Sequence, residues 1–319
     1  MNETTILLQA GPFTLTAFGL CVALGALAAV IAVMLLGRKD PCADGAASMT
    51  LAAILGALLG GRLAYCLTML DFILVDLGGA GFIPQLWQGG YTLYGAVLGA
   101  GAGVWLYARA TGRKAGRLLD LSAAGGALAL AFERGGEYFT SQGLGEYIWE
   151  ESWCRFPFAV ESVYGDWQIP VFMYEALAAL IIFVVLAVMV NRSKPGRTAE
   201  TFVILLGVTQ VILESLREDE FIRFGFVRFS QLAAAITMAA VMFLRLARMV
   251  KQGGWTPWQI IRLVLFLAGI VMIILLEFAL DKSTIDNVIL YFVMAGTLTV
   301  MAAAMLVDGK PARSESCPE

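Results

Sequence analysis

Histidine is absent from this 319-residue sequence, so the commonest neutral-pH base and the commonest metal ligand are both missing. Charge is also scarce: 15% of the residues are charged, against about 25% in soluble domains. Hydrophobic residues make up 59%. A chain this apolar has too little polar surface to cover itself in water. The composition therefore predicts an all-α, polytopic transmembrane helical bundle.

The sequence has five cysteines, and no two of them have C-x-x-C spacing: Cys21, Cys42, Cys66, Cys154 and Cys317. We read them as small apolar residues or lone thiols, and we expect neither a metal site nor a cofactor. The net charge is -3, and no Lys/Arg tract is present. We therefore expect no nucleic-acid partner.

Long apolar runs are long enough, at about 20 residues each, to span a bilayer. About nine such runs occur, near residues 13–36, 46–70, 90–109, 118–133, 171–191, 199–216, 228–249, 261–279 and 287–307. The first run follows "MNETTILLQAGP", which has no basic residue, so it is predicted to be a true span and not a signal peptide.

Lysine and arginine cluster after alternate runs, as in residues 38–39, 109–117 and 192–197. Because basic residues are enriched in cytoplasmic loops, this pattern predicts an outside N-terminus and a cytoplasmic C-terminus. Residues 134–169 then form the largest outer segment. Its composition is aromatic and acidic, which suits a segment lying at the membrane interface.

Two arginines, Arg62 and Arg134, lie within or at the outer ends of apolar runs, beside glycines and carboxylates. Charges at this depth usually face a bundle interior or a wet cavity. An arginine fork matches phosphate geometry, and glycines at helix ends permit close approach of a ligand. Together these features predict a phospholipid headgroup site.

Simpler roles also fit these residues. Arg62 could pair with a carboxylate and join two helices, and Arg134 could extend from its helix end to the headgroups. The glycines are also typical of close helix packing. Glu175 and Glu214 suit helix-end positions, and Tyr94 suits an interfacial belt.

Five motifs, taken in order, resemble the prolipoprotein diacylglyceryl transferase family. They are "GGRLAYCL", "LWQGGYTLYGAVLG", "ERGGEYFTSQGLG", "PVFMYEAL" and "ILESLRED". The resemblance implies a seven-span core that transfers a diacylglyceryl group from phosphatidylglycerol to the lipobox cysteine of a preprolipoprotein, with glycerol 1-phosphate leaving. It also implies a bacterial plasma membrane location.

Several family positions are substituted here. Tyr94 stands where the family has a histidine, Glu137 replaces an asparagine and Gln142 a glutamate. Leu206 and Gln210 replace a tyrosine and an arginine, and Phe18 replaces an aromatic hydroxyl.

The resemblance and the local chemistry give a set of candidate residues. Glu137 and Tyr94 are the catalytic candidates, with Glu137 the best remaining base. The candidates for lipid and phosphate binding are Arg134, Arg62, Gly89, Gly90, Gly95 and Gln142. The supporting candidates are Tyr174, Glu175, Gln210 and Glu214.

Residues 1–250 are predicted to form the transferase-like core, and 251–307 two additional spans with no counterpart in the resemblance. Residues 308–319 are predicted to form a cytoplasmic tail. The expected partners are phosphatidylglycerol, preprolipoproteins and membrane lipids. The alternative is a non-catalytic relative that binds phospholipid or a membrane partner, with the extra spans as an adaptor. A transporter is a weaker possibility.

Overall fold

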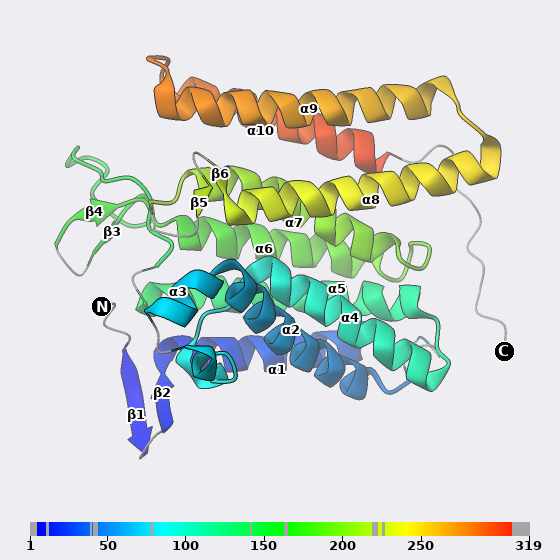
Figure 1. Ribbon diagram of the computed structural model, residues 1–319, viewed down its shortest axis with the longest axis horizontal. Coiled ribbons are helices and arrows are strands. Elements are labelled where there is room, and N and C mark those ends of the chain that lie inside the picture. Colours follow the sequence, from blue (N-terminus) through cyan, green and yellow to red (C-terminus); the bar gives the residue numbers. More distant parts are fainter. Residues whose placement is uncertain are drawn as a thin grey trace. The chain divides into compact units, whose positions relative to one another are not determined.

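The computed structural model describes residues 5–10, 13–38, 40, 44–76, 79–140, 142–162, 165–218, 223–224 and 227–307 (Figure 1). The predicted tail, 308–319, lies outside these residues.

Nine long helices dominate the described part of the chain. They are α1 (Ala17–Gly37), α2 (Ala46–Thr68), α4 (Leu93–Thr111), α5 (Ala115–Gly136), α6 (Val171–Met189), α7 (Arg197–Ser215), α8 (Phe229–Gly253), α9 (Pro257–Lys282) and α10 (Asn287–Leu306). Eight of them are long and apolar enough to cross a membrane; α4 falls outside this set. Glycines and tyrosines lower the hydropathy of α4. The prediction of an all-α, multi-pass membrane bundle is confirmed.

Short elements connect these helices. A short helix α3 (Leu70–Val75) and the 3-10 turns η2 (Ala80–Phe82) and η3 (Leu86–Gln88) lie between α2 and α4, and η4 (Glu137–Phe139) follows α5. Three small antiparallel pairs complete the described elements: β1 (Ile6–Ala10) with β2 (Phe13–Thr16), β3 (Val160–Glu161) with β4 (Trp167–Gln168), and β5 (Arg223–Phe224) with β6 (Val227–Arg228). The segment 134–169, which the sequence predicts to lie outside the membrane, is therefore largely irregular after the end of α5.

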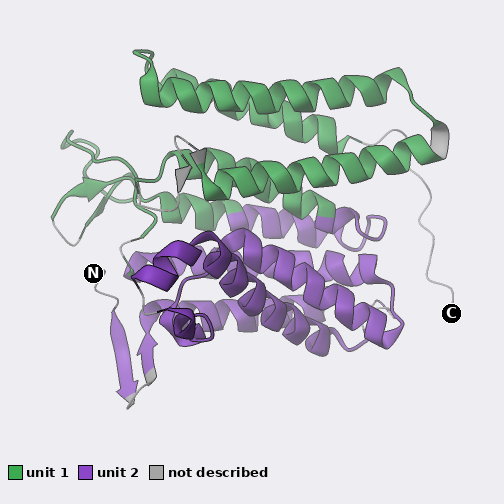
Figure 2. Ribbon diagram, viewed as in Figure 1, with its two compact units in different colours: residues 1–3, 140–178, 200–313 green, residues 4–139, 179–199, 314–319 purple. Residues whose placement is uncertain are grey.

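The chain divides into two compact units, coloured separately in Figure 2. Unit 1 contains residues 1–3, 140–178 and 200–313, and unit 2 contains 4–139, 179–199 and 314–319. The division falls within α6 and close to the start of α7. Each unit is described by itself.

Unit 2 contains a glycine seam between α2 and α4, formed by Gly56 and Gly60 on α2 and by Gly95, Gly99 and Gly103 on α4. A methyl group at Gly60 would lie 2.5 Å from the Gly95 carbonyl oxygen, and one at Gly99 would lie 2.9 Å from the Gly60 Cα. Small residues let membrane helices approach until their backbones touch. The packing role expected for these glycines is confirmed.

The loops at one end of unit 2 are joined by Arg117, at the start of α5. Its guanidinium pairs with Asp40 after α1, and it donates to the Val190 carbonyl and, at 2.7 Å, to the Asn191 side chain after α6. Asp120, fully buried, accepts from the Gly196 and Ala199 amides at 2.7 and 2.8 Å. Three loops that the sequence assigned to one membrane side thus meet at one end of the unit.

Unit 1 pairs α9 with α10 through an apolar seam. Phe266, Leu276, Leu290, Met294 and Leu298 are buried. Gly269 lies so close to the Met301 side chain that an added methyl group would overlap its sulfur.

Leu144 and Gly145, the part of the segment 134–169 that lies near the start of unit 1, are also fixed by hydrogen bonds. The Gly145 amide donates to the Ile169 carbonyl, and the Glu218 amide donates to the Leu144 carbonyl. A methyl group at Gly145 would lie 2.6 Å from the Leu216 carbonyl oxygen, so glycine is required for this close approach.

Candidate functional site

The charge cluster of the "ERGGE" motif lies at the end of α5, in unit 2. Arg134 occupies the last turn of the helix and is 8% exposed, while Glu137 opens η4 and is 4% exposed. The Arg134 guanidinium forms a close ion pair with Glu137 and a second pair with Glu133, at 3.4 Å. The structure therefore brings a phosphate-binding candidate and the candidate base into direct contact. The i, i+3 spacing along the chain produces this contact.

Arg62, in α2, is held by carbonyl oxygens. Its side chain donates to the carbonyls of Phe82 at 2.7 Å, Ile83 at 3.2 Å and Gly90 at 3.3 Å, and also to that of Gly89. The guanidinium carbon lies 4.5 Å from the centroid of the Phe82 ring, a cation–π distance. Arg62 is 3% exposed, so the η2–η3 loop forms a cradle around its charge.

Gly89 and Gly90 give this cradle its shape. Both have left-handed backbones, with φ of 75° and 74°. A methyl group at Gly90 would lie 2.9 Å from an Arg62 nitrogen. These two lipid-binding candidates therefore contact Arg62 with their carbonyls.

The start of α4 holds Tyr94 and Gly95. Thr92 caps the helix by accepting from the Gly95 amide at 3.3 Å, and Tyr94 is buried in the first turn, 4% exposed. Gly95 belongs to the glycine seam with α2. Just before the helix, burial raises the pKa of the Tyr91 phenol above its usual value, while the charge of Arg62 partly opposes the rise.

In unit 1, three supporting candidates form one buried network with two arginines. The Gln210 amide donates to both carboxylates, at 3.2 Å to Glu175 and 2.7 Å to Glu214. Arg217 pairs with Glu175 at 2.9 Å, and Arg228 lies 3.7 Å from Glu214. All five side chains are at most 8% exposed. The network contains two carboxylates and two guanidinium groups, so each acidic side chain has an arginine partner.

The remaining candidates, Gln142 and Tyr174, lie in unit 1 outside the hydrogen bonds of this network. Gln142 is exposed, and its backbone amide donates to the Thr140 hydroxyl at 3.4 Å. Tyr174 is half-buried in the first turn of α6, next to Glu175.

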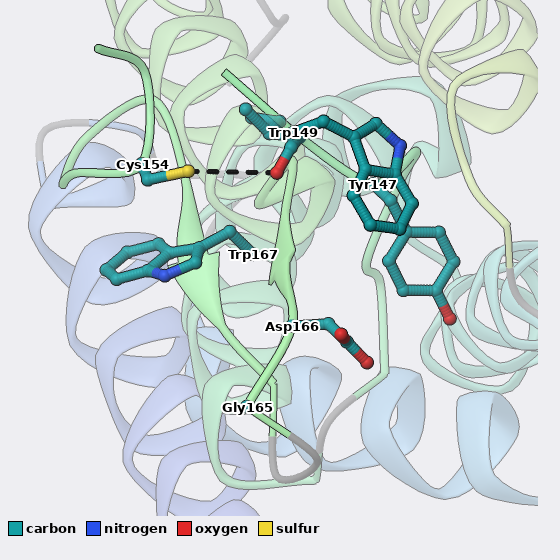
Figure 3. Close-up of a pocket in the computed structure, with 7 residues that line it drawn as sticks. Tyr147, Trp149, Cys154, Gly165, Asp166 and Trp167 are labelled. Carbon is teal, nitrogen blue, oxygen red and sulfur yellow. Dashed lines mark hydrogen bonds between the residues drawn. The ribbon is translucent and has the colours of Figure 1, made fainter. Parts of the chain in front are cut away.

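The segment 134–169 carries a shallow pocket of its own (Figure 3). Tyr147, Trp149 and Trp167 line it together with Cys154, whose thiol donates to the Ile148 carbonyl at 3.7 Å. Trp149 is 85% exposed and Phe156 70%. None of the sequence-derived site candidates lines this pocket. The exposed aromatic side chains fit the prediction that the segment lies at the membrane interface.

Sequence reasoning missed part of the unit 1 network. Neither Arg228 nor Glu277 is among the candidates that the sequence indicated. In the structure, Glu277 accepts hydrogen bonds from Ser215 and Gln231. The available signal was the position of Glu277 within a long apolar run, because a carboxylate at that depth needs partners.

Comparison with known proteins agrees with the motifs. The family model described as prolipoprotein diacylglyceryl transferase matches residues 5–275. A phosphatidylglycerol–prolipoprotein diacylglyceryl transferase of Streptococcus pneumoniae serotype 4 is 26% identical over 228 residues, which cover 69% of this chain and 85% of the relative. The protein of that name from Streptococcus mutans serotype c is 24% identical over 250 residues, covering 76% and 95%. The chain belongs to the prolipoprotein diacylglyceryl transferase family.

Proposed function

We propose that this protein transfers a diacylglyceryl group from phosphatidylglycerol to the lipobox cysteine thiol of preprolipoproteins. The observation that carries this assignment is the buried Arg134–Glu137 pair at the end of an apolar helix, within a chain of this family. Arg134 is suited to contact the lipid phosphate, and Glu137 is suited to take the proton of the thiol. The reaction needs both.

The proposed chemistry uses Glu137 as the base. It takes the proton of the lipobox thiol, and the sulfur attacks the glyceryl carbon that carries the phosphate ester. A carbon–sulfur bond forms, the carbon–oxygen bond breaks, and glycerol 1-phosphate leaves. Arg134 supplies fixed positive charge to the departing phosphate, and donors placed where charge develops are usually the largest catalytic contribution.

Tyr94 is proposed as a hydrogen-bond donor and not as a base, because a phenol titrates near pH 10, well above neutrality. Gln142 is proposed to contact the lipid headgroup, because it is exposed at the start of the outer segment. The balanced Glu175–Glu214–Arg217–Arg228 network is proposed to keep the ends of α6, α7 and α8 in fixed register.

Activity is tested with purified protein, phosphatidylglycerol vesicles and a lipobox peptide. The expected result is a diacylglyceryl thioether on the peptide cysteine and release of glycerol phosphate. A peptide with serine in place of the cysteine is the control and should remain unmodified. Lipid binding without thioether formation would contradict transfer and favour the non-catalytic relative.

We also propose that the protein resides in the bacterial plasma membrane with its N-terminus outside and its C-terminus in the cytoplasm. The alternation of basic loops supports this orientation. Single cysteines placed at Gly79 and Glu150 should react with an impermeant thiol reagent in intact cells. Cysteines at Lys114 and Ser193 should react only after permeabilisation, and labelling of either in intact cells would overturn the orientation.

A further inference from the structure

Both C-terminal helices contact Ser215, the last residue of α7. From α9, the Glu277 carboxylate accepts a hydrogen bond from the Ser215 hydroxyl. From α10, the Tyr291 hydroxyl donates to the Ser215 carbonyl at 3.2 Å, and the Met294 sulfur lies 3.9 Å from the Ser215 hydroxyl. All of these residues belong to unit 1. One residue of α7 therefore receives contacts from two later helices, through residues that follow it by more than 60 positions.

These contacts satisfy groups that would otherwise be costly. The last carbonyls of a helix have no intrahelical partner, and Tyr291 supplies one for Ser215. A carboxylate in an apolar helix needs donors, and Glu277 receives a second one from the Gln231 amide at 2.8 Å. Gln231 also donates to the Ser215 hydroxyl at 2.9 Å. Glu277, Ser215 and Gln231 thus form a closed triangle of hydrogen bonds.

The triangle continues into the charge network. Gln231 accepts from the Arg228 backbone amide at 3.1 Å, which caps the start of α8. The Arg228 guanidinium lies 3.7 Å from Glu214 and donates to the Arg217 carbonyl. Glu214 is the residue directly before Ser215. Glu277 is therefore connected to Glu214 both through the α7 backbone and through Gln231 and Arg228.

We propose that the α9–α10 hairpin is a built-in clamp on the Glu175–Glu214–Arg217–Arg228 network, with Glu277 and Tyr291 as its positioning residues. Its effect on transfer rests on the proposed function; the clamp itself does not. The sequence predicted two added spans outside the core. The hydrogen bonds instead make the hairpin part of what holds the last turn of α7.

The test compares full-length Glu277→Leu, Glu277→Gln and Tyr291→Phe with wild type. Asp281→Asn is the matched control, because it removes an acidic side chain from the same end of α9. Asp281 is half exposed and pairs with Lys282 at 3.2 Å. Amide hydrogen exchange over residues 210–217 measures the clamp, and kcat and KM for the lipobox peptide measure its effect.

Loss of the Glu277 hydrogen bonds should speed exchange over residues 210–217 about tenfold and lower kcat about tenfold, with KM for the peptide unchanged. Glu277→Gln keeps an acceptor oxygen, so it should retain most of the wild-type protection from exchange and most of the wild-type kcat. Tyr291→Phe should speed exchange about threefold, and Asp281→Asn should match wild type. If Glu277→Leu does not fold, Glu277→Gln and Tyr291→Phe decide by the same readouts.

Wild-type exchange over 210–217 in the folded variants would overturn the clamp. Faster exchange with unchanged kcat would overturn its role in transfer, even with the proposed function intact. If wild-type protein transfers no lipid, the proposed function fails, and the exchange measurement alone still decides whether the clamp exists.

Discussion

Arg62 and Arg134 look alike in the sequence but are held in different ways. Both lie in unit 2 toward the ends of apolar helices, and both are at least nine-tenths buried. Arg62 donates to four backbone carbonyls of the η2–η3 loop, at residues 82, 83, 89 and 90. Arg134 pairs with Glu133 and Glu137, the carboxylates of its own turn and the next.

The two arginines differ in whether a phosphate could replace their present hydrogen-bond partners. The four carbonyls around Arg62 would lose their charged donor if the side chain turned to a ligand, so we infer that Arg62 chiefly stabilises the loop. The Arg134 partner is a carboxylate, and a phosphate offers the same kind of acceptor. When Glu137 takes a proton, its hold on Arg134 weakens. An arginine paired with the proposed base is therefore suited to exchange partners during the proposed reaction.

The largest expected effect tests the Arg134 side of the comparison. Glu137→Gln should lower transfer to the lipobox peptide by about 10²- to 10⁴-fold, the usual contribution of a general base. Phosphatidylglycerol binding should be kept or strengthened, because Arg134 loses a competing negative charge. Near-normal transfer by a folded Glu137→Gln protein would show that another group takes the thiol proton.

The next effect tests the Arg62 side. Arg62→Gln should lower the stability of the protein by about 3 kcal/mol, because the buried loop carbonyls lose a charged donor. Thermal unfolding in detergent measures this loss. Arg38→Gln is the control, because Arg38 is exposed at the end of α1. Normal stability with lost lipid binding would break the comparison and make Arg62 a phosphate ligand.

Substitution of Arg134 should have a smaller effect, and it should change lipid binding more than stability. Arg134→Gln should weaken phosphatidylglycerol binding roughly 10- to 150-fold, as expected for a charge-assisted hydrogen bond of about 1.5–3 kcal/mol. Arg134→Lys keeps the charge without the fork and should fall between that and wild type. Unchanged binding by folded Arg134→Gln would leave Arg134 as a helix-end charge.

The sequence predicted the helices well, because long apolar runs are a strong and local signal. Their ends were less accurate. The run predicted at 261–279 is the helix Pro257–Lys282, which begins earlier because Thr256 and Gln259 form a capping box and Pro257 occupies the first turn. Hydropathy does not detect such polar caps. The β1–β2 pair was also missed, although Gly11 and Pro12 between its two short runs are a turn signal.

The site could be predicted only where its contacts are local. Arg134 and Glu137 are three residues apart, so the motif itself places them together. The contact between Glu277 and Ser215 joins residues 62 positions apart, and nothing in either local sequence names the partner. Arg62 illustrates the same limit, because an arginine beside glycines suits either a ligand or a loop carbonyl. The difference depends on where the loop folds.

The smallest expected effect distinguishes two roles for the glycines beside Arg62: support of the Arg62 side chain and direct contact with the lipid. Gly90 has a φ of 74°, and a methyl group there would meet an Arg62 nitrogen at 2.9 Å. Gly90→Ala should therefore lower stability by about 1–2 kcal/mol, through left-handed strain and a displaced guanidinium. Gly81→Ala is the matched control in the same loop, because a methyl group there meets nothing within 4 Å.

Thermal unfolding should distinguish the two variants, while the folded fractions of both should bind phosphatidylglycerol equally. A Gly90→Ala protein that unfolds like wild type but binds lipid more weakly would place Gly90 against the lipid. The cradle around Arg62 would then be part of the binding site.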